Sequence, residues 1–84
     1  MTRDEIAGAI LKIFKEGFEI TDPDLNDNLK EKYEFDSIDA IALLEYMEKI
    51  IGSQLTQEEK KQTLEIRTIN QICDYIEEMM RKRQ

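Results

Sequence analysis

Histidine is absent from this chain of 84 residues, and cysteine and proline each occur only once. The lack of histidine removes the commonest general base, the usual activator of a nucleophile and a common zinc ligand. The single cysteine, Cys73, excludes an internal disulfide, and no cysteine pair indicates a metal site. No run reaches the roughly 18 apolar residues of a membrane span, and the N-terminus lacks the apolar core of a signal peptide. Enzyme activity is therefore disfavoured, and we expect a soluble, cytoplasmic protein.

Basic residues are outnumbered by acidic ones, 12 to 19, which gives a formal net charge of −7. This charge disfavours nucleic acid and anionic lipid as partners, and favours proteins that present Lys and Arg patches. Hydrophobic residues make up 40% of the chain, and its 84 residues suffice for one modest core. We therefore expect a single domain over residues 1–84, and nothing in the composition demands an oligomer.

Three stretches carry the period of about 3.6 residues that is typical of amphipathic helices. The first begins after a capping box formed by Thr2 and Glu5 and ends near Gly17. The second covers 37–51 and ends at Gly52, and the third runs from Thr68 to the basic residues 81–83. Their predicted core residues are Ile6, Ile10, Leu11, Ile13, Phe14, Ala40, Leu43, Leu44, Met47, Ile50, Ile51, Ile69, Ile72, Cys73, Ile76, Met79 and Met80.

The two remaining connections carry no sustained helical period. We expect 18–35 to be a long loop pinned by scattered apolar residues, with a short turn near 28–32. In the second connection, 53–67, the sequence predicts a short helix over 58–64, anchored by Leu55, Leu64 and Ile66. The acids of 22–28 resemble a calcium loop, but they lack its glycine and its last glutamate, so no metal is predicted. The predicted fold is all-α, a small bundle of three long helices and one short helix with a long first loop.

The candidate functional residue is Ser37, within Asp36-Ser37-Ile38 at the start of the second predicted helix, where Asp36 or Ser37 can be the N-cap. No activating partner for its hydroxyl is evident, so no catalytic residue is predicted, and the hydroxyl suits modification by another protein. Beyond it, two isoleucines fall outside the apolar arc of the helix, among acids, and such a surface favours recognition by a basic partner. The predicted recognition residues are Ile38, Asp39, Ile41, Glu45 and Glu48.

Residues Phe35-Asp36-Ser37-Ile38-Asp39 resemble the Asp-Ser-Leu attachment motif of acyl carrier proteins, and 29–39 and 68–76, with its Asp-Tyr-Ile ending, are similar to this family as well. The resemblance implies that a phosphopantetheinyl transferase attaches 4′-phosphopantetheine to Ser37, with Asp36 near the metal ion used in the transfer. The phosphodiester would lie at a helix N-terminus, where free amides and the helix dipole favour an anion. The thiol of the arm would carry acyl groups as thioesters to acyl-transferring and condensing enzymes of fatty acid, lipid or polyketide synthesis.

The chain departs from the family pattern at Ala42, where many members carry glutamate, and at Glu45, which replaces an apolar residue. Its second connection is also longer than usual by a few residues. These departures indicate a specialised member. Two other interpretations stay open: an acidic helical adaptor in which Ser37 is only a helix cap, and a small enzyme that uses Asp36 and Asp39. We also expect Cys73 to be buried and the basic residues 81–83 to form a solvated helix end.

Overall fold

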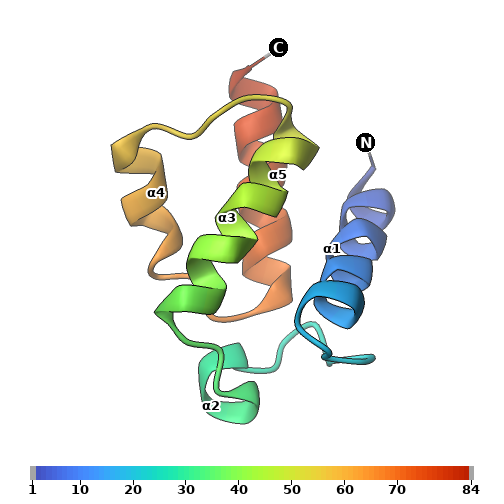
Figure 1. Ribbon diagram of the computed structural model, residues 1–84. Coiled ribbons are helices and arrows are strands. Elements are labelled where there is room, and N and C mark those ends of the chain that lie inside the picture. The colour runs from blue at the N-terminus through green and yellow to red at the C-terminus, as the bar shows by residue number, and fades with distance from the viewer. Residues whose placement is uncertain (1, 84) are drawn as a thin grey trace.

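The computed structural model describes residues 2–83, which form five α-helices and no strand (Figure 1). The helices are α1 (Arg3–Gly17), α2 (Leu29–Tyr33), α3 (Ser37–Ile51), α4 (Gln57–Thr63) and α5 (Ile69–Lys82). The predicted all-α bundle of three long helices and one short helix is confirmed, and the single turn of α2 lies inside the predicted long loop. The bounds predicted for α3 are confirmed, whereas α4 begins and ends one residue earlier than predicted.

A reciprocal capping box begins each of the four longer helices. The side chain of the N-cap residue accepts a hydrogen bond from the third amide of the helix, and the side chain of that third residue accepts one from the amide of the N-cap. Two amides that the helix itself cannot satisfy are thereby bonded at each start. The capping pairs are Thr2 with Glu5, Asp36 with Asp39, Thr56 with Glu59, and Thr68 with Gln71.

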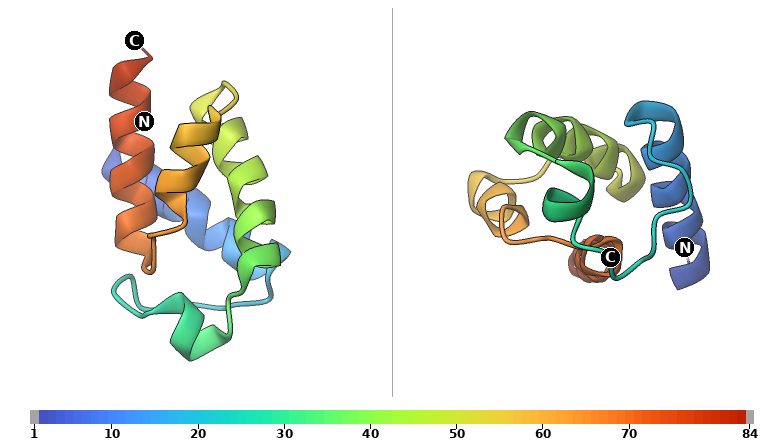
Figure 2. Two further views of the ribbon diagram at one scale, coloured as in Figure 1. Left: turned by 90° about the vertical axis from the view of Figure 1, so that its left-hand side faces the viewer. Right: turned by 90° about the horizontal axis from the view of Figure 1, so that it is seen from below.

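The largest share of the hydrophobic core comes from α5, which packs against both α1 and α3. Figure 2 shows α5 end-on in its right-hand view, with α4, α3 and α1 arranged around it. The buried side chains of α1 and α3 complete the core from two sides. Cys73 is buried within it, as predicted. The buried residues of these three helices are Ile6, Ile10, Phe14, Leu43, Met47, Ile69, Ile72, Cys73, Tyr75, Ile76 and Met79.

The connection between α1 and α3 is pinned to the start of α5. The amide of Leu29 donates to the carbonyl of Arg67 at 2.8 Å, and the amide of Asn70 donates to the carbonyl of Leu25 at 3.0 Å. The side-chain amide of Asn70 also donates to Asn26 Oδ1 at 2.6 Å. These bonds satisfy backbone groups that a long loop would otherwise leave to water. The loop therefore follows a defined path to the start of α3.

Phe35, the residue before the N-cap of α3, is held in a cluster of four aromatic rings. The ring centroid of Phe35 lies 5.5 Å from that of Phe14 and 5.3 Å from that of Phe18. Phe18 also meets Tyr46 of α3 edge to face, at 6.2 Å. Aromatic pairs at these distances add specific attraction to the burial of their area. Phe35 directly precedes Asp36, so this cluster holds the chain where it enters α3.

The prediction that Leu64 anchors the second connection to the core is wrong. Leu55 is buried and Ile66 is half-buried against the core, but Leu64 is 60% exposed at the end of α4. The seven residues of α4 contain no apolar side chain, and none of them is buried. The helix therefore has no apolar face that would turn its last residues into the core.

Candidate functional site

Asp36 caps α3, and Ser37 is the first residue inside the helix. Asp36 Oδ1 accepts hydrogen bonds from the amides of Ile38 and Asp39, both at 3.0 Å, and Asp39 Oδ2 accepts one from the amide of Asp36 at 3.3 Å. Of the two candidate caps, the structure uses Asp36, so Ser37 does not have the role that the adaptor interpretation gave it. The same bonds occupy the amides of Ile38 and Asp39, two of the amides at the helix N-terminus where the phosphodiester was expected.

The side chain of Ser37 is exposed to solvent. Within residues 2–83 its hydroxyl makes no hydrogen bond, because the neighbouring carboxylate of Asp36 satisfies the helix amides that a serine cap would bind. The backbone around it is fixed by α3 on one side and by the packed ring of Phe35 on the other. Ser37 thus presents an uncommitted hydroxyl from a rigid position, where the active site of another protein can reach it.

An apolar pocket of about 220 Å³ lies beside Ser37, between α3 and α4. Ala40 and Leu44 were predicted to be core residues; they are half-buried, because they line this pocket together with Leu43 and Met47. For scale, a dry cavity of about 150 Å³ lined by Leu, Ile and Phe binds benzene. The remaining lining residues are Leu29, Lys30, Phe35, Asp36, Thr63, Leu64, Ile66, Arg67 and Ile72.

Two cationic side chains, Lys30 and Arg67, line the same pocket as Ser37. Arg67 Nη1 donates to the carbonyl of Leu64 at 2.6 Å and to that of Ile66 at 3.1 Å, so this guanidinium stays close to the end of α4. Asp36 also lines the pocket, so two basic side chains and one carboxylate border it.

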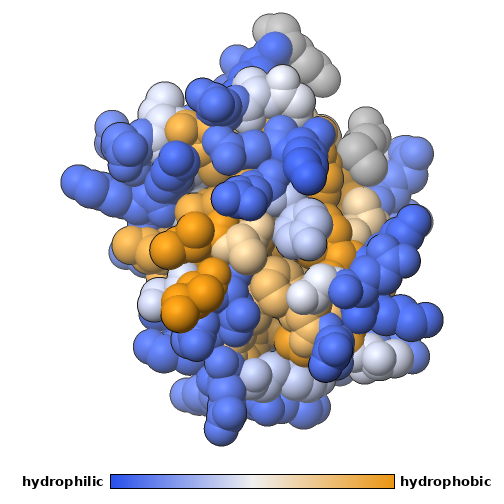
Figure 3. Space-filling model, in the orientation of Figure 1, coloured by the Kyte–Doolittle hydropathy of each residue, from blue (hydrophilic) through white to orange (hydrophobic). Residues whose placement is uncertain are grey.

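Three large hydrophobic side chains stand out from the surface near the pocket. Ile38 is 74% exposed, Ile41 is 61% exposed and Leu64 is 60% exposed. Figure 3 shows hydrophobic residues gathered over α3 and toward α4, with hydrophilic residues around them. Ile38 and Ile41 lie about one turn apart on α3, and neighbouring exposed apolar side chains mark contact surfaces more often than isolated ones do. We call Ile38, Ile41 and Leu64 the apolar triad.

The predicted recognition residues divide into two groups. Ile38, Ile41 and Glu45 are exposed, as the helical period predicted. Asp39 is half-buried and belongs to the capping box of α3. Glu48 is also half-buried, and its Oε2 accepts the amide of Leu55 at 2.8 Å. Asp39 and Glu48 therefore support the helix start and the following loop, rather than projecting freely outward.

The acids of the first loop bond within that loop. Asp24 Oδ1 accepts the amide of Asn26 at 2.8 Å, and Asp27 Oδ2 binds Lys32 Nζ at 2.9 Å. The bond from Lys32 holds the pKa of Asp27 below its ordinary value. Within residues 2–83, no group of three or more His, Cys, Asp or Glu side chains could hold a metal ion. In the same part of the chain, no helix combines the length and the apolar character needed to cross a bilayer.

Sequence reasoning missed three residues of this site, namely Lys30, Leu64 and Arg67. A signal for Leu64 was present, because it follows seven residues without one apolar side chain and so belongs to no apolar face. Lys30 and Arg67 carried no such signal. They lie 37 positions apart (67 − 30), and only the pairing of the first loop with the start of α5 brings their segments together.

Comparisons with known proteins agree with this geometry. The family model described as "Phosphopantetheine attachment site" matches residues 5–76, which is most of the chain and leaves out only the first two residues of α1 and the end of α5 among the helices. Neither the curated proteins nor the solved structures contain a significant match. Members of the matched family carry covalently attached 4′-phosphopantetheine and generally act as non-catalytic carriers. The chain therefore belongs to the phosphopantetheine attachment family and is an acyl-carrier-like protein.

Proposed function

We propose that this chain carries acyl intermediates as thioesters on a 4′-phosphopantetheine arm attached to Ser37. The observation that carries the proposal is the position of the Ser37 hydroxyl, which is exposed, free of hydrogen bonds within residues 2–83 and next to an apolar pocket. A phosphopantetheinyl transferase can reach this oxygen without unfolding α3. The hydroxyl needs no activating partner of its own, because the transferase supplies the base.

The residues around Ser37 fit the phosphodiester of such an arm. Asp36 already occupies two amides at the start of α3, so the helix N-terminus alone does not compensate the added negative charge. Lys30 and Arg67 line the same pocket and supply compensating positive charge. Asp36 Oδ2 makes no hydrogen bond within residues 2–83, which leaves this oxygen able to face the metal ion of the transferase.

The pocket is the proposed shelter for the cargo. When bound, the arm supplies the thiol that holds the acyl group. Leu43, Leu44 and Met47 offer the acyl chain an apolar wall, and each CH₂ group that leaves water is favoured by about 0.8 kcal/mol. With a volume of about 220 Å³, the pocket suits a short chain better than a long one.

The apolar triad and Glu45 form the proposed surface for partner enzymes. Ile38 and Ile41 would fill apolar holes in the partner, while Glu45 would meet a Lys or Arg side chain. Leu64 extends the surface across the mouth of the pocket onto the end of α4. The proposed partners are the phosphopantetheinyl transferase and the acyl-transferring and condensing enzymes of cytoplasmic fatty acid, lipid or polyketide synthesis.

Intact mass spectrometry tests the attachment directly. The purified chain is incubated with coenzyme A and a transferase of broad specificity, and we expect the mass to increase by one phosphopantetheine group. The increase should disappear in Ser37→Ala. The chain has one other serine, Ser53, which is also exposed, so Ser53→Ala is the matched control and should gain the same mass as the unmodified sequence.

Two results would contradict the proposal. One is a folded protein that gains no mass with any of several transferases, which would favour the adaptor interpretation. The other is a mass increase that persists in Ser37→Ala, which would place the arm on another residue. Circular dichroism of each variant establishes that the helices are intact before the masses are compared.

A further inference from the structure

The position of α4 is not set by burial of its own side chains. None of its residues is buried, and its seven side chains are all polar or charged. Of the apolar residues next to it, Leu55 is buried before the helix begins, while Leu64 is exposed where it ends. Yet Thr63 and Leu64 form part of the wall of the pocket beside Ser37. Leu55 and Ile66 anchor the chain on either side of α4, and the helix between them is held by polar contacts.

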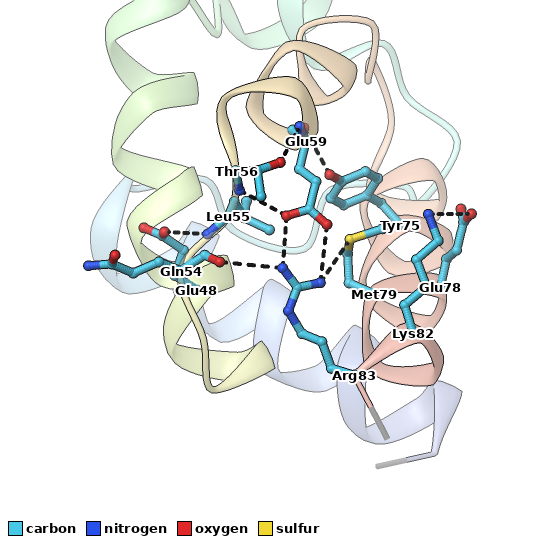
Figure 4. Close-up of polar contacts among 10 residues, drawn as sticks. All are labelled: Glu48, Gln54, Leu55, Thr56, Glu59, Tyr75, Glu78, Met79, Lys82 and Arg83. Carbon is cyan, nitrogen blue, oxygen red and sulfur yellow. Dashed lines mark hydrogen bonds and ion pairs between the residues drawn. The ribbon is translucent and has the colours of Figure 1, made fainter.

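The strongest of these contacts joins Glu59 of α4 to Arg83, which directly follows α5 (Figure 4). Arg83 Nη2 donates to Glu59 Oε1 at 2.8 Å, and Arg83 Nη1 donates to Glu59 Oε2 at 3.2 Å. The two side chains are only 24% and 17% exposed, so water screens the pair less than it would on an open surface. The prediction of a solvated basic helix end is wrong for Arg83, because its guanidinium is used in this bidentate pair.

Further bonds fasten the same end of α4 and the loop before it. Arg83 Nη2 also donates to the carbonyl of Gln54 at 3.3 Å, and the hydroxyl of Tyr75 donates to the carbonyl of Glu59 at 2.8 Å. Glu59 Oε1 in turn accepts the amide of Thr56 at 2.8 Å. Figure 4 shows these groups converging on Glu59. The contacts all lie before or within the first turn of α4, whereas the pocket lies at its opposite end.

We propose that Arg83 is a positioning residue for α4 and that, through Glu59, it sets the size of the pocket beside Ser37. The pair holds the first turn of α4 against α5, and the rigid helix transmits that position to Thr63 and Leu64 at the pocket. Loss of the pair allows α4 to pivot away from α3, which widens the pocket. The selectivity for acyl chain length follows from this spacing, and this last step rests on the proposed carrier function.

Matched variants separate the effect of the pair of Glu59 with Arg83 from that of a change in surface charge alone. Arg83→Met keeps an unbranched side chain but removes the guanidinium and its charge, and Arg81→Met makes the same change at an exposed position one half-turn earlier. Glu59→Gln keeps the capping box, since glutamine serves at the equivalent position of α5, and Glu58→Gln is its exposed neighbour. Arg83→Lys restores the charge but not the fork of two donors, so it should rescue only in part.

The first measurement uses the protein without an arm. Hydrogen exchange of the Lys60 amide, which bonds to the carbonyl of Thr56, reports how firmly the first turn of α4, where the pair acts, is held. We expect this exchange to accelerate about tenfold in Arg83→Met and Glu59→Gln, because a bidentate ionic pair is lost. It should be unchanged in Arg81→Met and Glu58→Gln. Equal exchange in Arg83→Met and Arg81→Met would overturn the inference.

The second measurement tests the pocket, again without an arm. A series of straight-chain alcohols of increasing length is titrated while the methyl resonances of Leu44 and Met47 are followed. We expect the preferred alcohol to be longer in Arg83→Met than in Arg81→Met. An unchanged preference would overturn the link between Arg83 and pocket size, even if α4 opens more often.

The third measurement repeats the length series with acyl groups loaded on Ser37, followed by the rate of thioester cleavage. We expect the best-protected chain to be longer in Arg83→Met. If Ser37 accepts no arm while the two measurements above change as expected, the positioning role of Arg83 stands and the proposed carrier function fails. If loading succeeds and the protected length is the same in both variants, the role of Arg83 in chain selectivity is overturned.

Discussion

Two helices that border the pocket, α5 and α4, are held in opposite ways. α5 buries six side chains, and Ile72 in its first turns lines the pocket from the core. α4 buries none and is positioned by the pair of Glu59 with Arg83. Movement of α5 would expose apolar surface at about 25 cal/mol per Å², whereas movement of α4 exchanges polar contacts for water.

This difference assigns the stability of the fold to one side of the bundle and the freedom to move to the other side. The α1–α5 side keeps the core packed, so the start of α3 and the hydroxyl of Ser37 stay in place. The α4 side can shift while the core remains closed. A pocket with one fixed wall and one adjustable wall can admit groups of different size without loosening the fold. The following predictions test this division.

The largest effect is expected in the core. Phe14 is fully buried in α1, with the rings of Phe18 and Phe35 at 5.3 and 5.5 Å. Phe14→Ala should lower the free energy of unfolding by about 3–5 kcal/mol, the usual cost of such a cavity, as measured by urea denaturation. The control Leu64→Ala, at an exposed position of the α4 side, should stay within about 0.5 kcal/mol.

A milder core change covers the case in which Phe14→Ala does not fold. Ile10→Val removes one buried methylene and should cost about 0.5–1.5 kcal/mol. If Leu64→Ala proved as costly as Ile10→Val, then Leu64 would contribute to the core in solution, and the contrast between the two sides would not hold.

Acid should loosen the α4 side before the core. The bond from Arg83, followed by the amide of Thr56, lowers the pKa of Glu59 from 4.5 to about 2. Because the pKa in the folded state is the lower one, the pair stabilises fully above pH 4.5, and its contribution is lost as the pH falls toward 2. Tyr75 stays protonated throughout, since burial raises the pKa of its hydroxyl.

The ratio of Lys60 amide exchange rates, Glu59→Gln over the unmodified sequence, measures this effect and cancels the intrinsic pH dependence of exchange. We expect a ratio of about ten near neutral pH, falling toward one as the pH drops through about 2. Glu58→Gln should give a ratio of one at every pH. A ratio for Glu59→Gln that stays constant with pH would show that the charge of Glu59 does not hold α4.

Loss of the N-cap threonine should lower the free energy of unfolding more in α5 than in α4. Thr68 and Thr56 cap α5 and α4 with the same kind of capping box. Thr68→Ala should lower the free energy of unfolding by about 1 kcal/mol, because α5 belongs to the core. Thr56→Ala should mainly accelerate amide exchange within α4 and change the urea midpoint less. Similar midpoint shifts for both variants would mean that α4 unfolds only together with the core.

The sequence predicted α1, α3 and α5 because each helix has its own apolar stripe and its own capping residues. The position of Asp36 and Ser37 at the start of α3, and the exposure of Ile38 and Ile41, followed from the same helical period, whereas the role of Ser37 was implied by the family resemblance. The pairing of Glu59 with Arg83 could not be predicted, because the two residues are 24 positions apart and no periodic pattern relates them. The pocket could not be predicted either, since it is the space left where side chains of several elements fail to meet.

The smallest effect is expected at Glu34, which ends α2, and Gly52, which ends α3, is the comparison for it. Gly52 ends α3 with φ 85°, and a Cβ added there would meet nothing within 4 Å, so Gly52→Ala tests the backbone alone and should cost about 1 kcal/mol. Glu34 ends α2 with φ 55°, in the same left-handed region. Glu34→Gly should gain about 0.5 kcal/mol, because relief of the strained backbone slightly exceeds the added freedom of the unfolded chain.

Urea denaturation of both variants measures these changes in the free energy of unfolding and tests how firmly the segment that leads to Ser37 is held. Glu34 lies three residues before Ser37, and its strain persists because Phe35 is packed against Phe14 and Phe18. If that packing dictates the backbone, Glu34→Gly gains stability while the chemical shifts of Ser37 stay unchanged. Loss of stability in Glu34→Gly, or movement of those shifts, would mean that the glutamate side chain itself holds the loop, and the start of α3 would then belong with the adjustable side of the molecule.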